Sequence, residues 1–253
     1  MLTIKGLSKN YRALRAVNFF NADIERGRIY GLIGTNGAGK TTVLNMISGL
    51  EKPGSGSIVF EGREIAGLPP EKITRYGIAR TFQNLRLFSS MTVLENVLVA
   101  AQINRRYNLL QAVLTTGSYR KDDQALRRKS AELLKIFDLE EAASAKAGSL
   151  PYGHQRKLEI ARALAAGAKL LMLDEPAAGM NPQESSHLME IIRKIRDDFG
   201  ITVILIEHDM KVVMGICEYV YAMAFGEIIE QGLPADILKS PKVIEAYLGG
   251  AHA

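Results

Sequence analysis

The feature that most constrains this chain is a glycine-rich run of the pattern G-x-x-x-x-G-K-T, formed by Gly34-Thr35-Asn36-Gly37-Ala38-Gly39-Lys40-Thr41-Thr42. An apolar segment suited to a buried strand precedes it at residues 28–33, and a segment suited to a helix follows at residues 42–47. Glycines in such a turn let backbone N–H groups surround phosphate oxygens, and the helix start adds the positive end of its dipole. Because strand, loop and helix occur in this order, the run predicts a phosphate-binding loop and not a ligand-free turn.

Individual residues of this loop have separate expected roles. Lys40 is expected to reach the β- and γ-phosphates of a nucleoside triphosphate, and the Thr41 hydroxyl is expected to bind Mg²⁺. Thr42, one position deeper, is expected to contact the α-phosphate. The other nucleotide-binding residues that the motif predicts are Gly34, Asn36, Gly37, Ala38 and Gly39.

A second motif places two carboxylates at the end of an apolar strand. Residues 170–173 are apolar, and Asp174 and Glu175 follow them directly. In a nucleotide-hydrolysing site the first acid supports Mg²⁺ and the second polarises the attacking water. Two acids at a strand end can also cap a helix, but the phosphate loop upstream favours the metal-binding interpretation.

Two polar residues at the ends of other predicted strands are further candidates. Gln83 follows the strand predicted at residues 78–82, where its side chain could ligate Mg²⁺ or position water. Taken alone, it could equally be a solvated loop residue. His208 follows the strand predicted at residues 201–206, at the edge of an open α/β sheet where ligands bind. It could hydrogen-bond a γ-phosphate there, although a lone histidine at a strand end is usually structural.

Tyr11 and Gly153 complete the candidate set. Tyr11 lies upstream of the phosphate loop, where an aromatic ring could stack on a purine or simply pack in the fold. Gly153 belongs to Leu150-Pro151-Tyr152-Gly153-His154, which leads into a helix predicted to run through Ala166. Backbone N–H groups at such a helix start present a positive dipole end to an anion.

The composition is that of an ordinary globular protein, with 47% hydrophobic and 23% charged residues among 253. The net charge of +5 could serve nucleic acid, an anionic membrane or only nucleotide phosphates, and its spread along the chain favours the last. No uninterrupted apolar run approaches the roughly 18 residues that a membrane span needs. The N-terminus has no apolar signal segment. We therefore expect a cytosolic protein that reaches a membrane only through a partner.

The order of the predicted elements indicates an α/β fold. Strands of alternating pattern are predicted at residues 2–7 and 17–24, ahead of the phosphate loop. Beyond residue 90 the pattern becomes helical, with an irregular surface excursion at residues 105–120 and an amphipathic helix at residues 121–137. We expect one domain, in which residues 1–83 and 167–253 form the core and residues 84–166 form an inserted helical subdomain.

In this order, the motifs resemble those of the ATP-binding subunits of ABC (ATP-binding-cassette) transporters over essentially the whole chain. The resemblance implies a P-loop NTPase (RecA-like) core with an N-terminal antiparallel β portion and the inserted α-helical subdomain. It also implies ATP and Mg²⁺ as cofactors. The segments that carry the resemblance are Tyr11 as the adenine-stacking aromatic, residues 34–42 as Walker A, Gln83 as the Q-loop, residues 150–154 as the signature, Asp174 and Glu175 as Walker B, residues 177–181 as the D-loop, and His208 as the switch histidine.

The resemblance also assigns roles to these residues. It implies that Glu175, His208 and Gln83 are catalytic, that Thr41, Gln83 and Asp174 hold the metal, and that Gly153 contacts the γ-phosphate of an opposing subunit. The nucleotide would be held by Tyr11, Gly153 and the loop residues named above.

Two positions depart from the family pattern. The signature usually reads Leu-Ser-Gly-Gly-Gln, and here Pro151 and Tyr152 replace its serine and first glycine. The D-loop usually ends in aspartate, and here Asn181 stands in that place. The first change removes a hydroxyl expected to touch the γ-phosphate, but it leaves the backbone contact of Gly153.

A narrower resemblance is to the importers of branched-chain amino acids. It rests on residues 78–84, 87–88, 91–96, 174–182 and 206–211, on the tail at residues 246–249, and on the excursion at residues 105–120. It implies ATP hydrolysis that drives uptake of hydrophobic amino acids through separate integral membrane permease subunits. Two ATPase subunits, identical or related, would sandwich two ATP molecules on the cytoplasmic face of the inner membrane.

Other functions stay open within and outside this family. The transported solute could be urea, or the chain could serve lipopolysaccharide export, whose ATPase is similar. A soluble cassette ATPase associated with nucleic acid is the candidate from another class. Such proteins carry two cassettes or a long coiled-coil insertion, and neither is present here, so we expect no nucleic-acid partner.

Overall fold

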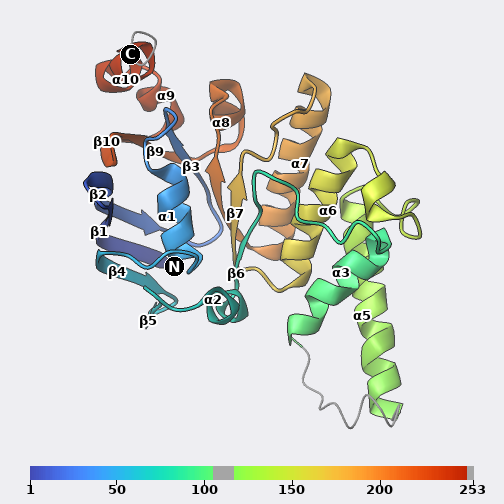
Figure 1. Ribbon diagram of the computed structural model, residues 1–253. Helices are drawn as coiled ribbons and strands as arrows, with labels where there is room; N and C mark the ends of the chain where they lie inside the picture. Colours follow the sequence, from blue (N-terminus) through green and yellow to red (C-terminus); the bar gives the residue numbers. More distant parts are fainter. Residues whose placement is uncertain (105–116, 250–253) are drawn as a thin grey trace.

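The chain folds around two β-sheets in the computed structural model, which describes residues 1–104 and 117–249 (Figure 1). The smaller sheet is antiparallel, with the strand order β2-β1-β4-β5. Its strands are β1 (Leu2–Tyr11), β2 (Leu14–Ile24), β4 (Ser55–Phe60) and β5 (Arg63–Glu64). It corresponds to the antiparallel portion predicted near the N-terminus.

The larger sheet has the strand order β10-β9-β3-β8-β7-β6. Its neighbouring strands run parallel from β9 through β6, and β10 forms an antiparallel hairpin with β9. The strands are β3 (Ile29–Gly34), β6 (Ile78–Arg80), β7 (Leu170–Asp174), β8 (Thr202–Ile206), β9 (Tyr219–Ala224) and β10 (Glu227–Gly232).

The central strands of this sheet are buried along their whole length. Every residue of β3, β7 and β8 is buried, because helices cover both faces of the sheet and each face needs apolar side chains. Successive residues therefore belong to two different cores. Leu171 and Leu173 of β7 join one cluster, whereas Met172 between them joins the other.

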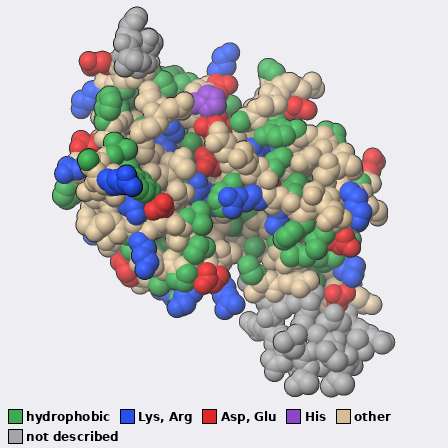
Figure 2. Space-filling model, in the orientation of Figure 1, with side chains coloured by type: hydrophobic (Ala, Val, Ile, Leu, Met, Phe, Trp, Pro, Cys, Tyr) green, Lys and Arg blue, Asp and Glu red, His purple; other side chains and the backbone are tan. Residues whose placement is uncertain are grey.

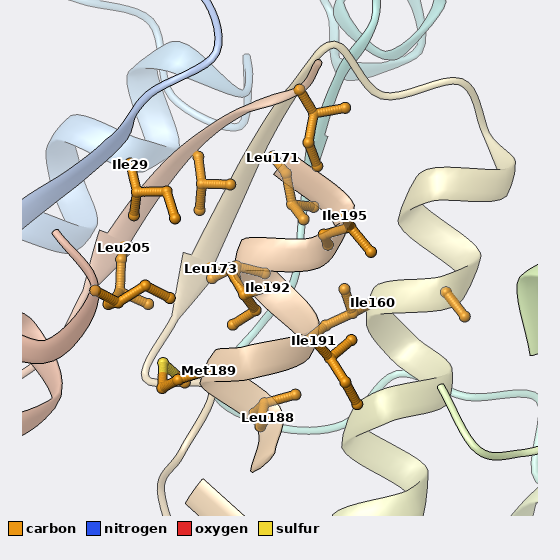
Figure 3. Packing of buried hydrophobic residues seen from close by; sticks show 14 of the residues in the cluster. Ile29, Ile160, Leu171, Leu173, Leu188, Met189, Ile191, Ile192, Ile195 and Leu205 are labelled. Atoms are coloured by element: carbon orange, nitrogen blue, oxygen red, sulfur yellow. The ribbon is translucent and has the colours of Figure 1, made fainter. Parts of the chain in front are cut away.

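One face of the sheet packs on α1 (Lys40–Ile47), and the other packs on α6 (Tyr152–Ala165), α7 (Pro182–Phe199) and α8 (Met210–Ile216). Figure 3 shows the second face, where Ile192 of α7 lies beside Leu173 of β7, and Leu188 and Ile195 of the same helix belong to the same cluster. The helix is amphipathic, with its apolar residues recurring at three- and four-residue spacing. Helix α1, which follows the phosphate loop, and the signature helix α6, which begins within the signature at residues 150–154, thus pack on opposite faces of one sheet.

Three helices form a layer beyond the edge strand β6, on the side away from the antiparallel sheet (Figure 1). They are α3 (Val93–Ala101), α5 (Gly117–Ile136) and α6, and each contacts the other two. Short elements complete the described chain: α2 (Pro70–Tyr76), α9 (Pro234–Ile237), α10 (Pro241–Gly249), and the 3₁₀ turns η1 (Gln102–Asn104) and η2 (Ala147–Ser149).

Most predicted elements are present, with differences at their ends. Helix α5 begins at Gly117, so the last part of the expected excursion is helical, and residues 105–116 of that excursion lie outside the described chain. Strand β6 ends at Arg80, and Gln83 therefore lies in a loop beyond the strand that we predicted to reach residue 82. The short elements β5 and α8 were not predicted from the sequence.

Charged side chains are interspersed on the surface shown in Figure 2, with hydrophobic side chains between them. On this face neither sign of charge forms a large uniform patch, in agreement with the spread of charges along the sequence. Among the described residues, none of the helices combines the length and apolarity that crossing a bilayer requires.

A buried asparagine fixes the loop that leads from the Q-loop into α3. Asn96 is fully buried. Its amide nitrogen donates to the carbonyl oxygens of Phe88 (3.0 Å) and Thr92 (2.9 Å), and its oxygen accepts from the Phe88 N–H (3.0 Å). This single side chain therefore supplies the acceptor for the N–H of the loop residue Phe88 and adds to the Met91 N–H that its carbonyl oxygen already accepts.

We predict that Asn96→Ala lowers the free energy of unfolding by about 2–3 kcal/mol, because the Phe88 N–H loses its acceptor and the carbonyl oxygens of Phe88 and Thr92 each lose one of their two hydrogen bonds. Urea unfolding of the full chain measures this loss. The matched control is Val99→Ala on the same helix, at a side chain 39% exposed, which should change stability by less than about 1 kcal/mol. Equal effects of the two substitutions would contradict the assigned role of Asn96.

Candidate functional site

The carboxyl ends of the parallel strands meet at one edge of the large sheet, where open α/β sheets bind ligands. Strand β3 ends at the phosphate loop, β7 ends at Asp174, and β8 ends two residues before His208. These segments are far apart in the sequence, and the parallel topology brings them together. Most of the predicted site residues therefore lie at this edge.

Lys40 begins α1 and is only 9% exposed. Its ammonium group donates to two carbonyl oxygens of its own loop, those of Gly34 (2.7 Å) and Thr35 (2.9 Å). Burial lowers the pKa of Lys40, and the carboxylates of Glu175 and Asp174 oppose that shift. The lysine and the two acids thus share one electrostatic environment.

Two glycines of the loop are required by close backbone contacts. A Cβ on Gly34 would lie 2.2 Å from the carbonyl oxygen of Met223, and one on Gly39 would lie 2.4 Å from that of Ala16. Gly39 also has φ +103°, a conformation that side chains disfavour. Gly37 has φ +79° but faces open space. The loop is therefore clamped by neighbouring backbone at both ends and open at its centre.

Asp174 is held by an arginine that we did not predict as a site residue. Arg80, at the end of β6, places its Nη2 2.9 Å from Asp174 Oδ2, and both side chains are more than nine-tenths buried. The Arg80 Nη1 donates to Asn45 Oδ1 of α1 at 2.6 Å. An arginine ending an otherwise apolar strand was the sequence signal for this ion pair, because such a charge needs a partner when buried.

Glu175 lies between the two other predicted catalytic residues. Its Oε2 accepts from Gln83 Nε2 at 3.4 Å, and its Oε1 lies 3.7 Å from His208 Nδ1. The backbone of Glu175 has φ +48°, and its N–H donates to the Ile206 carbonyl oxygen at 3.0 Å. A non-glycine residue in this left-handed region is sterically strained, so the surrounding strands fix where this carboxylate points.

Tyr11 is at the end of β1 and lies beside the phosphate loop. Its ring is 39% exposed, and the Lys9 ammonium lies 5.2 Å from the ring centroid. Burial raises the pKa of the Tyr11 hydroxyl, as does a hydrogen bond with Glu51, whereas a hydrogen bond with Thr42 lowers it. The aromatic ring is therefore next to the helix that begins with Lys40 and Thr41.

Gly153 is the one predicted binding residue that lies elsewhere. It is in the first turn of α6, and a Cβ placed there would lie 3.6 Å from Glu184 of α7. Pro151 is the N-cap residue of this helix, with φ −53° and ψ 150°, and it offers no side-chain hydrogen bond. Since α6 and α1 cover opposite faces of the sheet, one chain does not bring Gly153 to its own phosphate loop.

Asn181 precedes α7 and forms a complete capping box. Its side-chain oxygen accepts from the Glu184 N–H at 2.9 Å, and the Glu184 carboxylate accepts from the Asn181 N–H at 3.1 Å. Asparagine and aspartate are comparable in this position. A cleft of about 490 Å³ separates this D-loop from α8, and His208 and Gly179 are part of its lining.

Fold and site together define an α/β ATPase with a phosphate-binding loop. The ABC transporter family model matches residues 17–178, and a model described as branched-chain amino acid ATP-binding cassette transporter matches residues 227–253. The chain belongs to the ABC transporter family, and its activity is ATP binding and hydrolysis as a transporter subunit.

Curated relatives match over nearly their full length. The chain is 44% identical to the high-affinity branched-chain amino acid transport ATP-binding protein BraF of Pseudomonas aeruginosa, over 99% of this chain and 98% of BraF. It is 43% identical to LivG of Escherichia coli with the same coverage. It is 33% identical to the lipopolysaccharide export ATP-binding protein LptB of Haemophilus influenzae, over 98% of this chain and 97% of LptB.

Solved structures of cassettes have the same fold. The ADP conformation of MJ1267, an ATP-binding cassette of an ABC transporter, superposes with a TM-score of 0.85 at 30% identity, covering 98% of both chains. The dimeric post-hydrolysis state of the cassette MJ0796, bound to ADP and phosphate, superposes with a TM-score of 0.78 at 26% identity, covering 92% of this chain and 99% of that one.

The backbone contacts of the loop predict different costs for two similar substitutions. Gly37→Ala should cost about 1–2 kcal/mol of stability, the strain of a left-handed alanine in open space. Gly39→Ala adds a collision with the Ala16 carbonyl oxygen to a similar strain, and should cost at least about 2 kcal/mol more. Thermal and urea unfolding of the two variants, in the absence of nucleotide, measure the difference. Equal stability of the variants would show that the loop is not clamped as described.

Proposed function

We propose that this chain couples ATP hydrolysis to the uptake of branched-chain or other hydrophobic amino acids through separate integral membrane subunits. The observation that carries this proposal is the match to BraF and LivG along the whole chain, including the C-terminal segment at residues 227–253. The transporter partners would hold the chain at the cytoplasmic face of the inner membrane. Nucleic acid has no place in this function.

In the proposed site, the loop residues and Tyr11 bind ATP. Tyr11 would stack on the adenine, because its ring is partly open and lies beside Thr42. Lys40 would move from the carbonyl oxygens of Gly34 and Thr35 to the β- and γ-phosphates. The backbone N–H groups of Gly34, Asn36, Gly37, Ala38 and Gly39, with Thr42, would surround the phosphates.

The polar groups at the strand ends fit a bound Mg²⁺. Thr41, Gln83 and Asp174 offer a hydroxyl, an amide and a carboxylate oxygen, which are the hard donors that this cation prefers. Arg80 uses Oδ2 of Asp174, and the carboxylate has a second oxygen to offer. The cation, when bound, would neutralise charge that develops on the phosphates. Asp174 would be oriented for it by Arg80 and Asn45.

Glu175 would polarise the attacking water in this mechanism. Gln83 and His208 lie on its two carboxylate oxygens, at 3.4 and 3.7 Å, so both can orient the carboxylate and reach the same water or the γ-phosphate. The left-handed backbone of Glu175 would fix the direction of its carboxylate between these two side chains. Proton transfer of this type is most effective when the base is held in place before the reaction.

The signature would complete the site of a second chain. Gly153 lies on the face of the sheet away from α1, so two chains in a head-to-tail pair can each supply the part that the other lacks. The dimeric form of the MJ0796 cassette supports this arrangement. With Pro151 at the signature, the opposing γ-phosphate would be held by the Gly153 backbone, at about 1.5–3 kcal/mol, and by the helix dipole, at about 0.3–1 kcal/mol.

A second candidate is lipopolysaccharide export, which the 33% identity to LptB supports. Its support is weaker than that for amino acid uptake, because the identity to BraF and LivG is higher and their coverage is slightly greater. Urea uptake is a third candidate function within the same family. All three share the ATPase mechanism and differ in the membrane subunits.

We predict that Glu175→Gln abolishes hydrolysis and leaves ATP binding intact, since the amide keeps the shape of the side chain and loses the base. ATP-bound dimers should then accumulate, and size-exclusion chromatography with ATP and limiting Mg²⁺ would detect them. The matched control is Glu190→Gln, an exposed acid of α7, which should hydrolyse ATP at the wild-type rate. Normal turnover by Glu175→Gln would give that residue a purely structural role.

We further predict the result of a transport assay with the native complex, which is purified from membranes with this subunit as the bait and reconstituted in vesicles. Labelled leucine should cross the membrane when ATP is supplied on the side where this subunit lies. Uptake should stop with Lys40→Ala, which removes the charge facing the phosphates. Labelled urea and lipopolysaccharide transfer are assayed in the same vesicles. Movement of either of these, with leucine unmoved, would overturn the proposed substrate and retain the ATPase assignment.

A further inference from the structure

A buried arginine of the signature helix holds the backbone of the Q-loop. Arg156 is in the second turn of α6 and is completely buried. Its Nη1 donates to the Phe82 carbonyl oxygen at 2.6 Å and to Glu159 at 3.0 Å, and its Nη2 donates to the Gln83 carbonyl oxygen at 2.7 Å. Glu159 Oε1 also accepts from the Phe82 N–H at 3.4 Å. The Q-loop is therefore attached to α6 at consecutive peptide groups.

The same guanidinium reaches the residue that replaces the first glycine of the family signature. Nη2 of Arg156 donates to the Tyr152 hydroxyl oxygen at 2.8 Å. The ring of Tyr152 lies against the D-loop, because a Cβ placed on Gly179 would be 3.4 Å from its Cε1. A glycine at position 152 has neither the hydroxyl nor the ring, so these contacts exist only because of the substitution.

These contacts form a continuous series across the molecule. It begins at Gly179 in the D-loop and passes through Tyr152 and Arg156 to the backbone of Gln83. The Gln83 side chain then donates to Glu175 at 3.4 Å. The D-loop, the start of the signature helix, the Q-loop and the carboxylate beside the phosphate loop are thus joined through side chains of one chain.

The burial of Arg156 indicates that this side chain positions its neighbours and does not mainly stabilise the fold. A buried guanidinium loses its hydration, and among the described residues its one charged partner is Glu159, whose own pKa is raised by burial. An apolar side chain could fill this volume without desolvating two charges. The guanidinium instead provides a planar set of donors whose directions are fixed relative to one another. It therefore fixes the Gln83 backbone and the Tyr152 ring in a single geometry.

We propose that Tyr152 and Arg156 are positioning residues for hydrolysis, which hold Gln83 at Glu175 and keep the start of the signature helix in register with the D-loop. This inference rests on the roles proposed above for Gln83 and Glu175. Neither Tyr152 nor Arg156 contacts the phosphate loop of its own chain through any described hydrogen bond, so ATP affinity of the single subunit is independent of both. The step that depends on them is turnover.

The test compares Tyr152→Phe and Arg156→Lys in the full-length chain, with Tyr76→Phe in α2 as the matched control. Tyr152 is 43% exposed, so its hydroxyl can be removed without opening a cavity. We expect Tyr152→Phe to lower kcat about threefold to tenfold, which is the net value of a single hydrogen bond at a partly exposed side chain. Arg156→Lys should lower it further. The Kd for ATP, measured with a fluorescent analogue, should stay at the wild-type value in both variants.

The kcat of the double variant, Tyr152→Phe with Arg156→Lys, tests independently whether the two side chains act together. If the two side chains act as one unit, Tyr152→Phe should add nothing to the loss caused by Arg156→Lys, because the lysine no longer offers the donor that the hydroxyl accepts. Should Arg156→Lys fail to fold, the comparison of Tyr152→Phe with Tyr76→Phe decides alone. A wild-type kcat for Tyr152→Phe, or a loss confined to ATP affinity, would overturn the proposal.

Glu175→Gln, assayed in parallel, separates this inference from the proposed site. If Glu175→Gln is inactive while Tyr152→Phe and Arg156→Lys turn over normally, the site stands and the positioning role fails. If Glu175→Gln remains active, the proposed site itself fails, and the positioning role fails with it.

Discussion

The structure depends on a parallel sheet that is buried on both faces. Helices on each side bury every position of β3, β7 and β8, so charged side chains are excluded from the body of the sheet. They can appear only where the strands end. Because the strands are parallel, their carboxyl ends coincide at one edge. The clustering of the phosphate loop, the acidic pair and His208 follows from this constraint.

Local patterns in the sequence predicted much of this arrangement. The glycine run, the apolar strands and the residues directly after them identify the strand ends, because each signal lies within a few neighbouring residues. The capping box of α7 is another local signal, with Pro182 at the first helical position and Asn181 before it, but it was not among our predictions. The antiparallel sheet followed from alternating segments. The short helix α8 was missed, although Asp209 is a favourable cap for it.

Contacts between distant segments could not be predicted in the same way. Arg80 and Asp174 are 94 positions apart, and Arg156 and Phe82 are 74 apart. No periodicity links such positions, and a basic residue in an apolar segment indicates only that some partner exists. The position of Gln83 is also set by tertiary contacts, since β6 ends at Arg80 and α6 holds the chain beyond it. Ion pairs and hydrogen bonds between distant segments therefore determine the position of Gln83 and the orientation of Asp174, which the motifs alone do not specify.

The bonds of Lys40 to its own loop have a consequence for ligand selectivity. In the described structure the ammonium already has two neutral acceptors, the carbonyl oxygens of Gly34 and Thr35. A nucleotide must compete with these internal acceptors before it gains the lysine. Charged phosphate oxygens are stronger acceptors than carbonyl oxygens, but only a ligand long enough to place them at this point can replace the carbonyls. A nucleoside monophosphate is too short to displace these carbonyl oxygens from Lys40. The loop therefore favours nucleotides with a longer phosphate chain, because the carbonyl oxygens of Gly34 and Thr35 compete for the lysine.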